Sequence, residues 1–176
     1  MRQAILTLVT LLVVVVHTAL AQIFTDGDYR IYYGKTNVPR SHRFITAEPV
    51  HLHEGTVRTF PRNNSDLRQV WTLKNNAYGQ VTLESKAAPG KYLGLRRSGA
   101  NPGAYLGVVP HAVSYNITKK TGGSHTFYEL AYPDPVRNQI LIVSIANKHK
   151  QREPYYVNFG VQGTKGTMPG WNFDGV

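Results

Sequence analysis

Six basic residues and one proline, in three short polar segments, have the chemistry to anchor a protease-inhibiting loop. They are Lys35, Pro39 and Arg40, then Arg58 and Arg62, then Arg96 and Arg97. A substrate-like inhibitor docks a rigid, extended loop so that little entropy is lost, and trypsin-like proteases take Lys or Arg as the anchor. Proline fixes the backbone before the basic residue. The alternative is that these cations are solvated residues of a basic surface.

Aromatic side chains offer a second kind of binding chemistry. The chain contains 11 tyrosines, of which Tyr32, Tyr33 and Tyr105 are candidate platforms for a sugar ring. Carbohydrate sites combine such a platform with a few polar groups in a largely preformed pocket. The high β propensity of tyrosine explains much of the tyrosine content, so the sugar-binding interpretation ranks second to inhibition.

The sequence shows no pattern of a catalytic or metal site. Its 10 acidic residues are dispersed, and no G-x-S-x-G nucleophile elbow occurs. The segment His51-Leu52-His53 places two imidazoles on one face of an extended strand, but a zinc site needs a third ligand. We therefore expect a protein that acts by binding, with no enzymatic activity, cofactor or metal.

The composition restricts the partners further. The formal net charge is +10 and the chain has no cysteine. Positive charge favours acidic partners, but the basic residues are scattered in twos and threes, which makes nucleic acid an unlikely ligand. The lack of cysteine excludes a disulfide framework and thiol chemistry.

The first 21 residues predict a cleavable signal peptide. Arg2 supplies the positive charge, residues 4–16 are an apolar run, and Ala19-Leu20-Ala21 is the small-x-small pattern before cleavage. The run is shorter than the roughly 20 residues that a membrane-spanning helix needs. We therefore expect a secreted, extracellular protein with no membrane span, in which residues 22–176 form a single monomeric domain.

Two N-x-S/T sequons, at Asn63 and Asn116, are candidates for N-glycosylation in a eukaryotic secretory pathway. Asn63 lies in a polar, loop-like stretch. Asn116 lies beside expected core positions. We therefore expect Asn63 to be the better acceptor.

Hydrophobic patterning predicts an all-β fold. Short β-rich runs are separated by Gly, Pro, Asn and Asp, and no stretch has sustained helical periodicity. The twelve expected strands are residues 29–33, 43–46, 50–53, 70–74, 81–85, 92–95, 105–109, 114–119, 126–131, 139–145, 155–159 and 171–173. The prolines fall almost wholly between these runs, because a proline inside a strand loses a ladder hydrogen bond.

A degenerate threefold repeat organises these strands. A bulky residue closes each group of four strands, at Trp71, Ile117 and Trp171. A four-strand unit cannot bury its apolar face alone, so such units stack on one another. This recurrence predicts a β-trefoil, a barrel capped by three hairpins, in preference to a β-sandwich or jelly roll.

Gln69-Val70-Trp71 is a Q-x-W element and resembles the closing motif of ricin-B-type β-trefoils. From about residue 26 to residue 173 the chain also resembles small fungal β-trefoil proteins, the mycocypins and the cospin-like serine-protease inhibitors. The similar elements include the opening strand Gly27–Ile31 and the terminal Trp171-x-Phe173. This resemblance implies a loop-mediated inhibitor of a trypsin-like serine protease, with an extracellular protease as its partner.

The wider ricin-B-like group implies an alternative, a carbohydrate-binding lectin with a glycan as partner. Galactose-binding repeats of that group have an Asp early in the repeat and an Asn near the Q-x-W element. Asp26 and Asp28 are early acids of the first repeat, and the other two repeats lack one. A secreted effector or wall-associated binding protein is a third option, because one fold hosts unrelated functions.

Overall fold

The computed structural model describes residues 23–34, 42–50, 53–96, 102–122, 125–136, 138–145, 154–162 and 170–176. The predicted signal peptide lies outside these residues and stays a prediction. Within the described ranges, no helix has the length and apolar character needed to cross a membrane.

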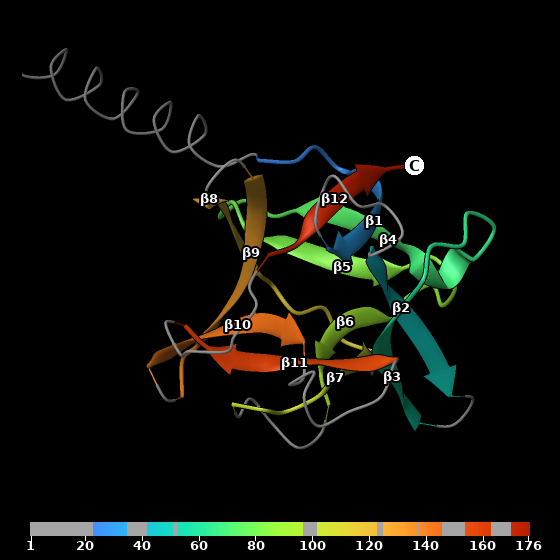
Figure 1. Cartoon of the computed structure of the whole chain (residues 1–176). Helices are drawn as coiled ribbons and strands as arrows, with labels where there is room; N and C mark the ends of the chain where they lie inside the picture. Colours follow the sequence, from blue (N-terminus) through green and yellow to red (C-terminus); the bar gives the residue numbers. More distant parts are fainter. Residues whose placement is uncertain are drawn as a thin grey trace, which may run out of the picture.

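The described residues form twelve strands and one short 3-10 helix (Figure 1). The elements are β1 (Gly27–Tyr33), β2 (Arg43–Val50), β3 (His53–Phe60), η2 (Leu67–Gln69), β4 (Val70–Asn75), β5 (Val81–Ser85), β6 (Tyr92–Leu95), β7 (Leu106–Val109), β8 (Asn116–Gly122), β9 (His125–Asp134), β10 (Gln139–Ile145), β11 (Tyr155–Val161) and β12 (Asn172–Gly175). The all-β expectation is confirmed.

The first and last strands of the three repeats form a closed barrel. Strands β12, β1, β4 and β5 pair in that order, and β8 pairs with β9. Two bridges complete the ring, Val81 with Tyr115 and Tyr128 with Trp171. The remaining strands form three hairpins, β2–β3, β6–β7 and β10–β11, which lie together in the lower half of Figure 1. A six-stranded barrel capped by three hairpins is a β-trefoil, as predicted, and the competing sandwich is wrong.

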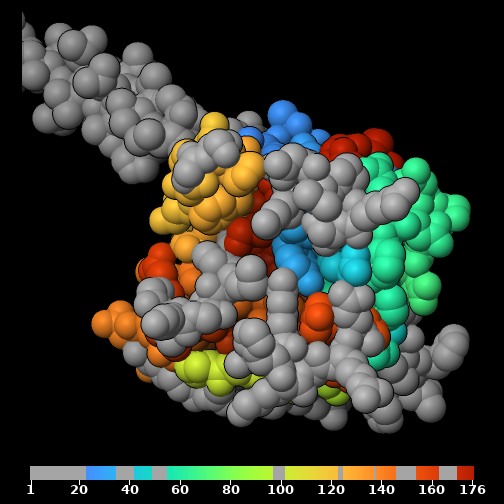
Figure 2. Space-filling view, viewed as in Figure 1, coloured from blue at the N-terminus to red at the C-terminus, as the bar shows by residue number. Residues whose placement is uncertain are grey.

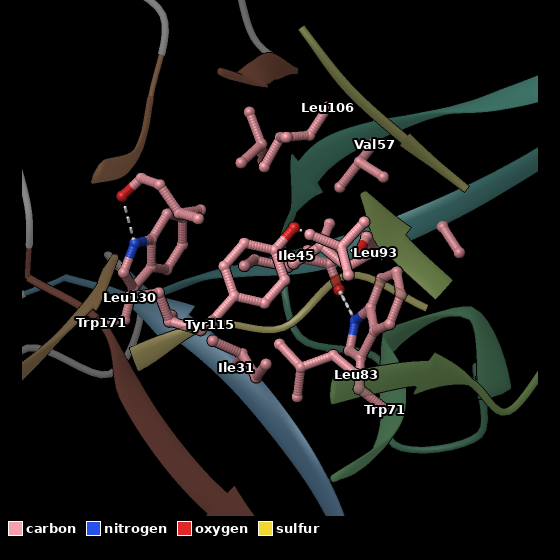
Figure 3. Close-up of a cluster of buried hydrophobic side chains, with 14 of the residues drawn as sticks. Ile31, Ile45, Val57, Trp71, Leu83, Leu93, Leu106, Tyr115, Leu130 and Trp171 are labelled. Atoms are coloured by element: carbon pink, nitrogen blue, oxygen red, sulfur yellow. Dashed lines mark hydrogen bonds between the residues drawn. The ribbon is translucent and has the colours of Figure 1, made fainter. Parts of the chain in front are cut away.

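Three buried rings occupy equivalent positions and close the repeats (Figure 3). The indole Nε1 of Trp71 donates a hydrogen bond to the Ile45 carbonyl at 3.0 Å, and that of Trp171 donates to the Val143 carbonyl at 2.7 Å. In the second repeat the Tyr115 hydroxyl donates to the Leu93 carbonyl at 3.1 Å. Each ring thus ties the last strand of its repeat to the second strand.

The expected closing residue of the second repeat, Ile117, is therefore wrong. Tyr115 makes the bridge to the first strand of its repeat and the hydrogen bond to the second, as the two tryptophans do. Ile117 lies two residues later and is only partly buried against the core. A tyrosine can replace tryptophan here because both carry an apolar ring and one hydrogen-bond donor.

The core repeats in layers of three, with one residue from each repeat. Fully buried triplets come from the first, second and third strands: Ile31, Leu83 and Leu130, then Ile45, Leu93 and Val143, then Val57, Leu106 and Val157. Complete burial of such a side chain stabilises the fold by about 1.5–3 kcal/mol. These layers fix the position of every strand, and hence of the residues on the outer face.

The third strand of the first repeat is longer than predicted and begins later. The expected strand was 50–53, whereas the structure has β3 over His53–Phe60. In β3 the alternate residues Gly55, Val57 and Thr59 are buried, while Thr56, Arg58 and Phe60 are partly exposed. Polar residues at its outer positions and the Pro61 that follows give this segment a loop-like sequence. Its true pattern is a half-buried strand.

Candidate functional site

The outer face of strands β12, β1 and β2 carries a group of aromatic and charged side chains. Tyr32 of β1 is the register partner of Phe44 in β2, and Arg30 is that of Asp174 in β12. Ile31 is fully buried, so its neighbours Arg30 and Tyr32 point away from the core. In Figure 2 the blue residues of β1, the cyan residues of β2 and the red C-terminal residues lie together on one face.

Three of these side chains form an aromatic stack. The Tyr32 ring lies 4.4 Å from the His42 ring in stacked geometry and 5.1 Å from the Phe44 ring. The guanidinium carbon of Arg62 lies 5.7 Å from the centre of the Phe44 ring. Phe44 is fully buried beneath its neighbours, so the accessible part of the stack is formed by Tyr32, His42 and Arg62.

A charged pair borders the stack. Arg62 Nη2 lies 3.1 Å from Asp174 Oδ2, and the two side chains are 49% and 39% exposed. Arg62 Nε also donates to Asn64 Oδ1 at 2.7 Å. A pair this exposed stabilises the fold by little, but both groups stay available to a ligand. We call Tyr32, His42, Phe44, Arg62 and Asp174 the Tyr32 cluster.

Beneath the cluster lies a buried cation with spare hydrogen-bonding capacity. Arg30 is 7% exposed and donates from Nη2 to the Asn64 carbonyl at 2.7 Å. Its Nε is buried without a hydrogen-bond partner. Burial, followed by the negative charge of Asp174, raises the pKa of the Tyr32 hydroxyl. The hydroxyl therefore remains a neutral donor and acceptor at physiological pH.

The loop that carries Arg62 is fixed by a buried glutamine. Gln69 Nε2 donates to the Pro61 carbonyl at 2.8 Å, and its Oε1 accepts from the Asn63 amide at 2.9 Å. Gln69 is 1% exposed. The glutamine of the Q-x-W element thus acts as a clamp for the loop and holds Arg62 against the Tyr32 cluster.

The structure brings together some of the residues proposed from sequence and separates others. Tyr32 and Arg62 meet in the Tyr32 cluster. Arg58 lies within β3, not in a loop, and both its Nε and Nη2 donate to the Glu48 carboxylate. Tyr33 is 8% exposed and packs edge-on against Trp171, so its proposal as a sugar platform is wrong. The described residues do not include Lys35, Pro39, Arg40 or Arg97. They also do not include the side chains of the His51-Leu52-His53 segment.

The early acids of the first repeat have structural partners. Asp26 Oδ1 accepts from the backbone and side-chain nitrogens of Asn75 at 2.9 and 2.7 Å. Asp28 accepts from the Thr72 hydroxyl at 2.6 Å and pairs with Lys86 at 2.8 Å. These bonds lower the pKa of both carboxyls and tie β1 to its neighbours.

The two sequons are both exposed but differ in structure. Asn63 lies in the β3–β4 loop, where its Oδ1 accepts from the Ser65 amide at 3.1 Å and the Ser65 hydroxyl at 2.8 Å. Asn116 lies in β8 opposite Ala131. Among the described side chains, no three His, Cys, Asp or Glu residues lie close enough to hold a metal.

Sequence reasoning missed several members of the Tyr32 cluster. Phe44 lies in the predicted strand 43–46, His42 directly precedes that strand, and Asp174 directly follows the predicted strand 171–173. Residues 44–47 are all buried, so the sequence around Phe44 shows no alternation that could have placed its ring on the outer face. No local pattern could have joined Asp174 to Arg62, because they are more than a hundred residues apart and meet only through the β1–β12 pairing.

Comparisons with known proteins establish the fold. No protein-family model matches the chain, and no curated protein matches it by sequence. A ricin B-like lectin from Macrolepiota procera, solved in complex with lactose, superposes with a TM-score of 0.65 at 18% identity, over 89% of this chain and 100% of that one. The Rhizoctonia solani agglutinin gives 0.60 at 16% identity, over 87% and 97%.

A third similar structure is the designed, threefold-symmetric protein ThreeFoil, with a TM-score of 0.60 at 16% identity over 86% of this chain and 100% of that one. At these identities the similarity shows the fold and not the function. It supports the wider β-trefoil group that the Q-x-W element indicates. The resemblance to fungal protease inhibitors stays a prediction from the sequence.

Proposed function

We propose that this β-trefoil protein binds carbohydrate through the Tyr32 cluster, after export from the cell. The observation that carries the proposal is a half-exposed carboxylate and guanidinium, Asp174 and Arg62, beside the stacked Tyr32 ring. A sugar presents an apolar face of C–H groups and a rim of hydroxyls. An aromatic ring contacts the face, and charged groups make strong hydrogen bonds with the rim.

The similar lectin and agglutinin structures support the proposal through the fold, because the lectin was solved in complex with lactose.

Protease inhibition is less well supported by the described residues. The loop of residues 61–66 has the rigidity that an inhibitor needs, because Gln69 clamps it. Its basic residue, however, donates to Asn64 and pairs with Asp174 on the body of the protein. A reactive residue should instead extend into the protease. The proposal favours carbohydrate, and an assay against trypsin-like proteases in which Arg62→Ala abolishes inhibition would reverse that order.

A glycan array followed by titration calorimetry tests the proposed function. We expect the purified protein to bind one or more neutral oligosaccharides, with lactose as the first probe. Tyr32→Ala and Arg62→Ala should each weaken binding by about tenfold, since each removes a ring contact or a charged hydrogen bond. Tyr78→Ala is the matched control, because Tyr78 is 88% exposed in the β4–β5 turn, away from the cluster.

The proposal fails if no neutral glycan binds above background. It also fails if the two cluster variants bind as tightly as the wild type. Thermal unfolding of each variant separates a lost contact from a lost fold, since only the former leaves the midpoint close to that of the wild-type protein.

A further inference from the structure

The three third strands meet at the centre of the hairpin cap in three outward-facing residue pairs. These pairs are Thr56 with Gly107, Tyr105 with Asn158, and Tyr156 with Arg58. The intervening Val57, Leu106 and Val157 are fully buried. Side chains alternate along a strand, so the paired residues point away from the core. We call the six paired residues the cap ring.

The cap ring offers an aromatic surface. The rings of Tyr105 and Tyr156, which occupy equivalent positions in two repeats, lie 4.8 Å apart at an angle of 41°. Tyr105 is 38% exposed. The guanidinium carbon of Arg58 lies 5.4 Å from the Tyr156 ring, but Glu48 neutralises this cation through both carboxylate oxygens. Arg58 therefore packs against the Tyr156 ring without adding net charge to the cap ring.

Arg96 adds an uncompensated positive charge beside this surface. A Cβ built on Gly107 would lie 2.6 Å from Arg96 Cγ and 2.6 Å from the Gly55 carbonyl oxygen. The Arg96 stem thus fills space that exists only because residue 107 is glycine. Ile45 and Leu93 are equivalent core residues, and Glu48 and Arg96 each lie three residues after them. The second repeat therefore has an arginine at the position where the first has a glutamate. No described residue pairs with its guanidinium.

Asn158 supplies an acceptor that lacks a donor. Its Oδ1 is buried and has no hydrogen-bond partner. Asn158 occupies the position that Arg58 and Gly107 hold in the other two repeats, directly opposite Tyr105. An unsatisfied buried acceptor destabilises a protein, and the residue as a whole is partly exposed, so a rotation of its amide brings Oδ1 within reach of a ligand donor.

We propose that the cap ring binds an acidic sugar, with Arg96 as the residue that selects the carboxylate. This inference rests on the proposed carbohydrate-binding function but uses a different site from the Tyr32 cluster. A sugar acid matches the three features together. Its carboxylate accepts from Arg96, a ring hydroxyl donates to Asn158 Oδ1, and its apolar face packs on Tyr105 and Tyr156. A neutral sugar leaves Arg96 unpaired, and a simple anion leaves Asn158 and the rings without a contact.

Titration calorimetry with a galacturonic acid trimer and its methyl ester tests this inference. The two probes differ only in charge and the ester methyl. The wild-type protein should bind the acid about tenfold more tightly than the ester, because the carboxylate forms a charge-assisted hydrogen bond. Arg96→Gln keeps most of the side-chain stem and removes the charge, so it should abolish the difference.

Arg68→Gln serves as the matched control, because this exposed arginine pairs with Asp66 and belongs to neither proposed site, and it should leave the preference for acid over ester unchanged. Equal binding of acid and ester by the wild type, or an undiminished preference in Arg96→Gln, would overturn the inference. The two proposals fail separately. If the Tyr32 and Arg62 variants bind lactose normally while Arg96→Gln loses the acid, only the Tyr32 cluster is wrong, and the opposite result removes only the cap ring.

Discussion

The inner and outer faces of the same third strands follow different rules. Inside, Val57, Leu106 and Val157 repeat almost unchanged around the pseudo-threefold axis. Outside, the equivalent set is Arg58, Gly107 and Asn158, which share no chemical property. The three closing rings repeat as the inner residues do, each with its hydrogen bond to the second strand.

This contrast separates what the fold requires from what the protein uses. Three repeats close one core, so any change inside one repeat must fit against the other two. A residue on the outer face meets mostly solvent and its own neighbours, and its substitution costs little. The fold therefore permits divergence among equivalent outer positions, and such positions can form a ligand site in one repeat without disturbing the core. The following changes test this division, from the largest expected effect to the smallest.

Trp171→Ala should reduce the free energy of unfolding by about 3–5 kcal/mol, because it leaves a cavity where a fully buried ring was. It also leaves the Val143 carbonyl without its donor. Urea denaturation monitored by circular dichroism measures the change. A loss below about 1 kcal/mol would show that the ring is not a structural element of the core.

Tyr115→Phe should cost about 1–2 kcal/mol, since the ring remains and only the hydrogen bond to the Leu93 carbonyl is lost. Burial, followed by the nearby Tyr132, raises the pKa of the Tyr115 hydroxyl far above its usual range. The unfolded chain ionises tyrosine near pH 10 while the folded one does not. Stability from this group is therefore complete below about pH 10 and declines as the pH rises further.

Denaturation curves at about pH 8 and about pH 11 measure that decline. The variant should lose less stability over this interval than the wild type. Ile117→Ala is the matched comparison for position, because Ile117 was the expected closing residue and is only partly buried. If the isoleucine variant were the more damaging of the two, the equivalence of Tyr115 with the tryptophans would be wrong.

Arg62→Ala should change the free energy of unfolding by at most about 1 kcal/mol, because its pair with Asp174 is half exposed. Its effect on stability should be much smaller than its effect on glycan binding. Arg62→Lys retains the charge but not the planar guanidinium, so its glycan affinity should fall between those of the wild type and Arg62→Ala. A large loss of stability in Arg62→Ala would place this residue with the core.

The strands and the trefoil were predictable because they depend on local alternation and on recurrence. Residues 81–85, 92–95 and 139–145 show their strand pattern without reference to the rest of the chain. The error at residues 50–53 arose where the outer face of β3 carries Arg58 and other polar side chains. Such a face hides the apolar half of the alternation.

The candidate site was predictable only in part, for a physical reason. Tyr32 and Arg62 could be named as chemically capable residues, but their partners depend on which strands are neighbours. Asp174 reaches Arg62 through the β1–β12 pairing, and Arg96 depends on the space left by Gly107 in another strand. The equivalence of Tyr115 with the two tryptophans likewise could not be predicted from sequence, because it depends on the hydrogen bond from its hydroxyl to the Leu93 carbonyl.

The closing rings also give the protein an internal optical reporter. The chain has only two tryptophans, and both are fully buried at equivalent places in the first and third repeats. Their emission should shift to longer wavelength when water reaches them. In Trp71→Phe the remaining signal comes from the third repeat alone, and in Trp171→Phe from the first. The second repeat is closed by Tyr115 and contains no tryptophan. The tryptophan fluorescence of each single-tryptophan variant therefore reports the unfolding of one identified repeat.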